Sequence, residues 1–469
     1  MLTLIPLIAT GIIPIFYIFP GLFLKKKRYF AFTSMILLTI AIIFTLIYWN
    51  AESEFYSLRI TPFSQFFSLV FLTVALFVCL SSLNSVSRFE DEYYFLILLS
   101  TFGMMVVSMS SDFIMLFIAF EIASIATYAL AGFEKGSEFS VEAAFKYFIF
   151  GGFSSALLLF GISIVYGYAG SVEIASITRM AEMEPTAYST IGLVMIVAGF
   201  GFKSALVPFH MWAPDTYHGS PTPISALLAS SAKKMGFAGM FKVMILMALA
   251  IKLEMYVLMA VIAVITMTLG NLAALMQESI KRMLAYSSIA HAGYISMAFA
   301  IFAISGMDMA LAGAFLHVLS HAIATACAFV TVAYAGGYIL DKADSFNSLG
   351  RRKPLIGISM SIILLSLAGI PPTLGFYSKF VLFLSAIEAK LLWLALIALL
   401  NSALSLYYYS KVIMRMFWKH EKMVEFIREK DKECTVVIVA GALILVVLGI
   451  LAGPVTEWAL SSARVLVLK

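Results

Sequence analysis

The chain has 469 residues, of which 62% are hydrophobic and only 12% are charged. A soluble domain averages about 45–50% apolar and about 25% charged residues, so a water-soluble fold could not cover this much apolar surface. The composition therefore excludes a soluble enzyme, a disordered chain and a nucleic-acid-binding protein, and the net charge of +5 is small for this length. The cysteines Cys79, Cys327 and Cys434 stand singly, without the spacing of a metal site or a disulfide framework.

Long apolar runs follow one another along almost the whole chain. A helix needs about 20 apolar residues to cross a bilayer core about 30 Å thick. We expect about fourteen transmembrane helices and therefore an all-α polytopic membrane protein, with residues 1–469 forming a single integral membrane domain. The runs lie at residues 2–24, 29–49, 63–83, 93–111, 112–133, 143–168, 188–210, 222–250, 254–276, 282–304, 308–339, 354–387, 391–417 and 434–460.

The distribution of basic residues indicates how the helices are oriented. The cluster Lys25, Lys26, Lys27 and Arg28 follows the first helix instead of preceding it, so this helix is not a signal peptide. The odd-numbered connections hold most of the loop lysines and arginines. The positive-inside rule then places these connections in the cytoplasm and both termini outside, in the cytoplasmic membrane of a prokaryote.

A few charged residues fall inside the predicted helices. Glu121 lies about nine residues into the fifth helix, and Lys203, Lys233 and Lys379 lie well within later helices. A charge at the bilayer centre costs roughly 2.5–3.5 kcal/mol on insertion scales, so such residues are functional candidates. Lys234 points to a different helix face from its neighbour, so we expect only one of the two to face a shared pathway. Lys242 and Lys411 lie near helix ends, where a lysine can reach the interface.

Four histidines accompany these charges: His210, His291, His317 and His321. Histidine can accept and donate a proton near neutral pH, which suits a proton relay. His317 and His321 are four residues apart and share one helix face. No carboxylate or cysteine stands near them in the sequence, so we expect no metal site. The alternative interpretation is a plain hydrogen bond between helices for each histidine.

Prolines interrupt two of the predicted helices. Pro208 and Pro214 break helix 7 behind Lys203, and Pro371 and Pro372 break helix 12 ahead of Lys379. Interrupted helices at corresponding places in two halves are typical of inverted-repeat transporters. We therefore expect two inverted five-helix repeats. The expected divisions are residues 1–90 for helices 1–3, 91–251 for helices 4–8, 252–418 for helices 9–13 and 434–460 for helix 14.

Four segments together resemble one family. They are K-S-A-L-V-P-F-H-M-W-A-P-D-T-Y-H-G-S-P-T-P-I-S-A from Lys203, S-D-F-I-M-L-F-I-A-F-E-I-A-S-I-A-T-Y-A-L-A-G-F at 111–133, K-R-M-L-A-Y-S-S-I-A-H-A-G-Y at 281–294 and G-I-P-P-T-L-G-F-Y-S-K-F at 369–380. They are similar to the antiporter-like proton-pumping subunits of respiratory complex I, most of all the N-type subunit. The resemblance spans about residues 90–420. One segment of helix 11, L-H-V-L-S-H-A, is more similar to the M-type subunit or to Mrp-type antiporter subunits. The lysine at position 379 argues against the M-type subunit, which has a glutamate there. The lack of a long lateral helix after helix 14 argues against the L-type subunit.

The resemblance implies roles for matching residues. Glu121 would pair with Lys203 and switch in response to a neighbouring subunit. A proton would enter from the cytoplasm towards Lys233, pass through the histidines of helices 10 and 11, reach Lys379 and leave outside. The predicted proton pathway thus comprises Glu121, Lys203, Lys233, His291, His317, His321 and Lys379, with Lys234, Lys411 and His210 as secondary candidates.

The same resemblance implies partners and cofactors. This chain itself is expected to hold no metal or redox cofactor, so flavin, iron–sulfur clusters and quinone would belong to partner subunits. Those partners would be other antiporter-like subunits, quinone-site membrane subunits and peripheral redox subunits. A subunit of an Mrp-type sodium/proton antiporter or of a membrane-bound hydrogenase stays open as an alternative. A small-solute transporter and a purely structural membrane subunit are the rival classes.

Overall fold

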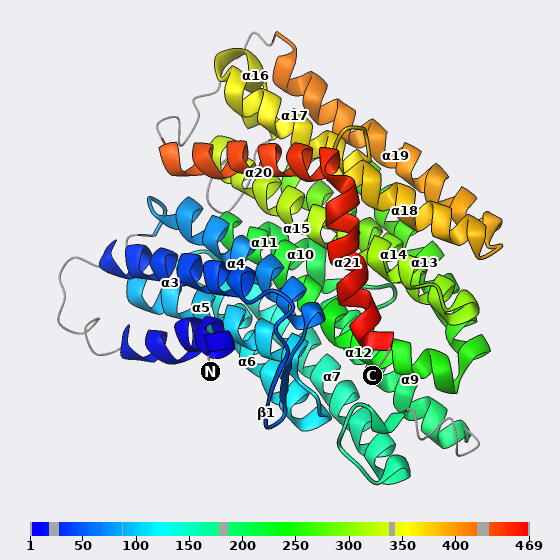
Figure 1. Ribbon diagram of the computed structural model, residues 1–469. Helices are drawn as coiled ribbons and strands as arrows, with labels where there is room; N and C mark the ends of the chain where they lie inside the picture. Colours follow the sequence, from blue (N-terminus) through cyan, green and yellow to red (C-terminus); the bar gives the residue numbers. More distant parts are fainter. Residues whose placement is uncertain are drawn as a thin grey trace.

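The computed structural model describes residues 2–17, 28–86, 88–177, 186–336, 343–419 and 431–467, and these are almost entirely helical. Figure 1 shows the helices gathered into one bundle. The predicted all-α membrane fold is therefore confirmed. Lys25, Lys26 and Lys27 of the basic cluster lie outside the described residues. The first part of the bundle comprises η1 (Leu2–Leu4), α1 (Ile5–Leu7), η2 (Ile8–Ile12), η3 (Ile13–Tyr17), α3 (Arg28–Ile47), the hairpin β1 (Ser53–Phe55) and β2 (Leu58–Ile60), and α4 (Pro62–Ser82).

The two repeats follow in order along the chain. In each repeat the fourth helix is broken, and these broken helices are five places apart. Because five is odd, the second repeat crosses the membrane in the opposite direction to the first. The first repeat consists of α5 (Glu90–Met109), α6 (Phe113–Ala131), α7 (Glu138–Ala169), α9 (Ala187–Lys203), α10 (Trp212–Gly219), α11 (Thr222–Leu227), η4 (Leu228–Ala232) and α12 (Lys233–Ala250). The second consists of α13 (Lys252–Leu275), α14 (Ile280–Ser305), α15 (Asp308–Ala335), η5 (Ala343–Phe346), α16 (Leu349–Arg352), α17 (Pro354–Ala368), α18 (Leu374–Glu388) and α19 (Leu392–Phe417).

In the residues that the structure describes, each of the fourteen predicted runs corresponds to one or more helical segments. Ten described helices are long and apolar enough to cross a membrane alone. The other four runs are interrupted. The described part of the first is a series of short helical segments, and helix 8 contains the π-helical turn η4. Helix 7 breaks at Pro208 and helix 12 breaks at Pro371 and Pro372, as predicted. Val207–Pro208 and Pro371–Pro372 are the cis peptide bonds of these two breaks.

The last predicted run differs from the structure. A single helix over 434–460 was expected, but α20 (Lys432–Ile450) ends early and α21 (Ala452–Val467) begins as a separate helix. Pro454 explains the difference, because it has no N–H for the carbonyl of Ile450 and its ring collides with that turn. Figure 1 shows α21, in red, running in a direction different from α20.

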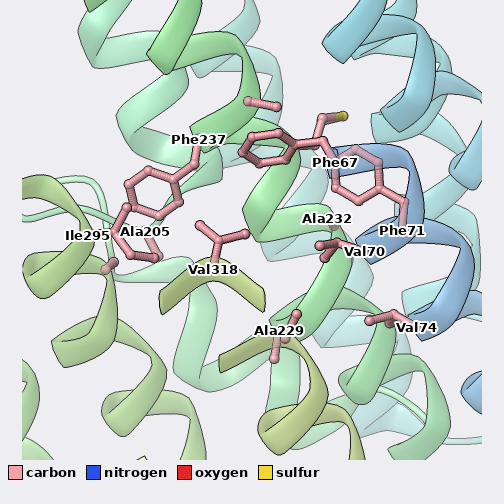
Figure 2. Packing of buried hydrophobic residues seen from close by; sticks show 14 of the residues in the cluster. Phe67, Val70, Phe71, Val74, Ala205, Ala229, Ala232, Phe237, Ile295 and Val318 are labelled. Atoms are coloured by element: carbon pink, nitrogen blue, oxygen red, sulfur yellow. The ribbon is translucent and has the colours of Figure 1, made fainter. Parts of the chain in front are cut away.

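The centre of the bundle is formed by α14 and α15, each about 94% buried over its membrane window, whereas α3 and α20 are only 33% buried and turn apolar side chains outwards. Figure 2 shows apolar side chains from α4, η4, α12 and α15 packed together in the interior. Phe67 and Val318 belong to this cluster. Polar side chains such as Lys203 and His317 are buried in the same interior.

Both chain ends lie at the same face of the bundle. Thr3 Oγ1 is 3.0 Å from Ser53 Oγ of the hairpin. Near the other end, Ser462 Oγ donates to the carbonyl of Pro62, which follows the hairpin directly. We call this the hairpin face. The opposite end, which carries Lys135 and Arg282, is called the basic face.

Candidate functional site

Lys203 is the last residue of α9, where the first broken helix stops. Its side chain is fully buried. Nζ donates to Ser124 Oγ at 3.0 Å and approaches Thr127 Oγ1 at 3.5 Å, both on α6. The ammonium also lies 4.7 Å from the ring centre of Tyr147, within cation–π range. Hydroxyls and aromatic faces therefore surround this charge.

The expected Glu121–Lys203 ion pair is not formed in this structure. The Glu121 carboxylate instead accepts a short hydrogen bond from Ser155 of α7. Ser124, the partner of Lys203, lies one helical turn from Glu121 on α6, so the two groups are close enough to meet after a side-chain rotation. Glu121 is partly exposed and lies on the same side of α6 as Ile118 (48% exposed). The carboxylate thus stands between the interior and the outer surface of the bundle.

Lys233 and Lys234 follow the π-helical turn η4 directly. Such turns are frequently found at functional sites. Both side chains are buried. Lys233 Nζ donates to the carbonyl of Ser288 at 2.7 Å and to its hydroxyl at 2.8 Å. Lys234 Nζ lies 2.6 Å from His321 Nδ1 and donates to the carbonyl of Ala229 at 3.2 Å. The two amines therefore reach different central helices, α14 and α15.

The three predicted relay histidines come together. His291 Nδ1 is 2.9 Å from His317 Nε2. The rings of His291 and His321 pack with their centres 4.6 Å apart. His317 Nδ1 is 2.9 Å from the hydroxyl of Ser378, which precedes Lys379. Within the described residues, no three His, Cys, Asp or Glu side chains are arranged to hold a metal ion.

Lys379 closes this chain of polar groups at the second broken helix. Nζ donates to the carbonyls of Leu367 and Ala368, both at 3.0 Å, and to Ser402 Oγ at 2.9 Å. The last carbonyls of a helix have no intrahelical partner and carry partial negative charge. The break after α17 therefore supplies the ligands of this ammonium, and the ring of Tyr294 lies 4.9 Å away.

Polar atoms without a protein partner occupy the stretch between Lys203 and Lys233. Within the described residues, Ser204 Oγ, His210 Nδ1 and Ser230 Oγ are buried and make no hydrogen bond to protein. Buried polar groups of this kind are normally bound to water. His210 lies in the loop between α9 and α10.

The remaining predicted residues lie at the periphery or in the breaks. Lys411 is exposed near the end of α19, as expected for a lysine that reaches the interface. Pro214 lies inside α10, two residues after its start, instead of in the break itself. Lys242 is partly buried and its Nζ donates to the carbonyl of Ser110.

Sequence reasoning missed several hydroxyl partners. Ser124, Ser288, Ser378 and Tyr409 each contact a predicted lysine or histidine. Serine and tyrosine are common in membrane helices and carry no charge, so residue type alone does not distinguish these four from the other serines and tyrosines of the chain. Helical spacing is the one available signal, because Ser288 lies three residues before His291 on α14.

A surface ion-pair cluster on the basic face was also missed. Asp215 of α10 accepts hydrogen bonds from Lys146 and Arg282, both at 2.8 Å. Burial raises the pKa of Asp215, but these two hydrogen bonds outweigh it and hold the pKa below its usual value. The cluster ties α10, the second part of the broken helix, to α7 and α14.

Comparison with known proteins agrees with this geometry. Residues 110–405 match the family described as NADH:quinone oxidoreductase/Mrp antiporter, transmembrane. The chain is 46% identical over 425 residues to F(420)H(2) dehydrogenase subunit N of Methanosarcina mazei, covering 88% of this chain and 85% of that protein. It is 39% identical to NADH-quinone oxidoreductase subunit N of Trichlorobacter lovleyi, covering 84% and 82%.

Solved structures show the same fold. A chain of respiratory complex I from Thermus thermophilus superposes with a TM-score of 0.85 at 29% identity, covering 96% of this chain and 98% of that one. A chain of an archaeal membrane-bound sulfane sulfur reductase gives a TM-score of 0.87 at 25% identity, covering 99% and 97%. The resemblance predicted from the sequence is thereby confirmed, and the chain belongs to the NADH:quinone oxidoreductase/Mrp antiporter family of transmembrane proteins.

Proposed function

We propose that this chain is the N-type proton-translocating subunit of a redox-driven membrane complex. The similarity to F(420)H(2) dehydrogenase subunit N and to NADH-quinone oxidoreductase subunit N supports this assignment. The observation that carries it is the polar chain through the centre of the bundle, from Lys234 through three histidines and Ser378 to Lys379. Intramembrane ionisable residues arranged in this way mark proton relays.

Each histidine of the chain can pass a proton by accepting it at one ring nitrogen and releasing another proton at the other. His317 is hydrogen bonded on both sides, to His291 and to Ser378, so it relays without moving. The rings of His291 and His321 are in contact without a hydrogen bond in this structure, so this step requires a ring rotation or a water molecule. That interruption prevents a free proton leak along the chain.

The Glu121–Lys203 pair supplies the switch. In this structure Lys203 is turned to Ser124 and Glu121 to Ser155, which is the separated state. Rotation of the lysine towards the carboxylate would move its positive charge away from Lys233. Because like charges repel, Lys233 then holds a proton more readily, and it releases the proton when Lys203 returns. Partial exposure of Glu121 allows a neighbouring subunit to control this movement.

Redox chemistry would take place in partner subunits, which would hold the flavin and iron–sulfur clusters and reduce a membrane quinone or phenazine. We place the chain in the cytoplasmic membrane of a prokaryote, with the basic face in the cytoplasm and both termini outside, on the positive-inside rule. The common position of both chain ends at the hairpin face supports an even number of spans.

Co-purification in mild detergent followed by mass spectrometry tests the assembly. Iron–sulfur subunits, quinone-site subunits and related antiporter-like subunits are expected to accompany this chain. Small antiporter subunits without a redox module would instead make it part of an ion-exchange complex driven by an existing gradient.

Transport is tested in vesicles containing the purified complex. Lys233→Ala and Glu121→Gln are expected to reduce the number of protons pumped per electron severely, while the subunits still assemble. Lys135→Ala is the matched control, because Lys135 is exposed on the basic face and distant from the polar chain. Normal pumping in both test variants would refute the relay.

A further inference from the structure

A cavity of about 420 Å³ opens into the second repeat from the basic face. It lies between the turn that joins α13 to α14 and the end of α19. Its outer part is lined by both acidic and basic side chains, among them Glu278, Lys411 and Arg415. This volume accommodates several water molecules, since one occupies about 30 Å³ in the liquid. The polar rim keeps the opening hydrated.

The cavity is on the same side of the membrane as the surface cluster of the first repeat. Gln277 lines the cavity and accepts a hydrogen bond from Arg282 Nε at 3.3 Å. Arg282 in turn pairs with Asp215 of the broken helix α10 at 2.8 Å. The cavity therefore lies beside the ion-pair cluster on the basic face, but it opens into the second repeat, whereas the route predicted from the sequence enters through the first repeat.

The inner end of the cavity points along α14 towards the histidines. Met283 and Tyr408 form part of its lining, and both are almost fully buried. Ser287 and His291 follow Met283 at steps of four residues, so the three lie on one face of α14. Slightly more than two helical turns, about 12 Å along the axis, separate Met283 in the cavity wall from the histidine.

Two hydroxyl groups lead from His291 part of the way back towards this wall. The Tyr409 hydroxyl lies 3.3 Å from His291 Nε2 and makes a short hydrogen bond with Ser287. The ring of Tyr408 packs on that of Tyr409 with centres 4.5 Å apart, and its hydroxyl donates to Asn271 at 2.9 Å. Nε2 of His291 is the ring nitrogen left free by the bond to His317, so the histidine is contacted on one side by the relay and on the other by these hydroxyls.

We propose that this cavity is a second proton inlet, which delivers protons from the basic face to His291 through Ser287 and Tyr409. This inference depends on the proposed transport function. A hydronium ion in the cavity gives a proton to the Ser287 hydroxyl, which passes its own proton to the Tyr409 oxygen. Tyr409 in turn passes its own proton to Nε2 of His291. No net bond is gained or lost in the hydroxyl chain. The histidines are then loaded independently of Lys233.

A blocking experiment tests the inlet in vesicles of the intact complex. Lys411→Cys places an exposed thiol at the mouth of the cavity, and Lys135→Cys places one elsewhere on the basic face. Both are treated with a bulky maleimide that does not cross membranes. Cys79, Cys327 and Cys434 are fully buried and do not compete for the reagent. Modification at 411 is expected to lower the protons pumped per electron severalfold, and modification at 135 to leave the ratio unchanged.

Two further variants separate the possible failures. Tyr409→Phe removes the hydroxyl beside His291 and is expected to reduce pumping as the blocked mouth does. Lys379→Met tests the relay itself. If Lys379→Met abolishes pumping while the modified 411 variant and Tyr409→Phe pump normally, the inlet is refuted and the transport function stands. If Lys379→Met also pumps normally, the transport function fails, and the inlet with it.

Discussion

Replacing Gly369 by alanine is expected to displace Lys379 without removing any polar group. Gly369 caps α17 with φ of +88°, and a Cβ at this position would lie 2.9 Å from Lys379 Cδ. This is shorter than a van der Waals contact, and the lysine side chain is the flexible partner. Lys379 would therefore move away from the helix end that supplies its ligands.

The size of the effect follows from the contacts of Nζ. Lys379 makes three hydrogen bonds of 2.9–3.0 Å. A hydrogen bond to a charged group contributes roughly 1.5–3 kcal/mol, so the loss of one changes the energy of the charged lysine by that amount. If this difference appears in the barrier for proton transfer, pumping slows about tenfold to hundredfold.

Gly306→Ala is the matched control. Gly306 also has a positive φ, of +68°, but a Cβ there meets no atom within 4 Å. Both variants share the left-handed penalty of about 1–2 kcal/mol, so they should lose similar thermal stability. Only Gly369→Ala should lower the protons pumped per electron, measured with a pH-sensitive dye in vesicles alongside electron transfer. Equal pumping by the two variants would show that the carbonyls at the end of α17 do not control proton transfer through Lys379.

Three other outcomes are expected from the same assay. Lys234→Met removes the amine next to His321 and should reduce pumping, and an unaffected ratio would leave its neighbouring lysine as the only donor to the relay. Ser378→Ala interrupts the link between the histidines and the second broken helix, so pumping should fall while the assembled complex keeps its melting temperature. Gly236→Ala forces a Cβ to within 2.9 Å of backbone at the end of α9 and should lower both pumping and thermal stability, whereas Gly152→Ala, which meets nothing within 4 Å, should change neither.

The transmembrane helices and the two broken helices were predictable because each of them leaves a local signal in the sequence. Apolar runs mark the helices, and the prolines at 208 and 371–372 mark the broken ones. Pro454 marks the division between α20 and α21 in the same way. The prediction missed this division because the apolar run continues on both sides of the proline. The π-helical turn η4 (Leu228–Ala232) has no comparable signal in the sequence, because no proline or glycine marks it.

The charged members of the site were predictable, but their partners were not. A buried lysine or glutamate is conspicuous in an apolar run, which is why Glu121 and Lys203 stood out. Which groups they contact depends on helix rotation and on competing hydroxyls. Here Ser155 is hydrogen bonded to Glu121 and Ser124 is hydrogen bonded to Lys203, the two charged residues that the sequence suggested would pair. The burial of Lys234 together with its neighbour likewise required the positions of two separate helices.

The buried lysines have a common property with a collective effect. Within the described residues no carboxylate lies within ion-pair distance of Lys203, Lys233, Lys234 or Lys379. Their ligands are carbonyls, hydroxyls and rings, which carry no net charge. Every proton that enters therefore adds one uncompensated positive charge to the row, and repulsion from it discourages a second. The number of protons held by the row of lysines and histidines is therefore limited by their mutual repulsion, so that a proton arriving at one end favours the release of a proton at the other.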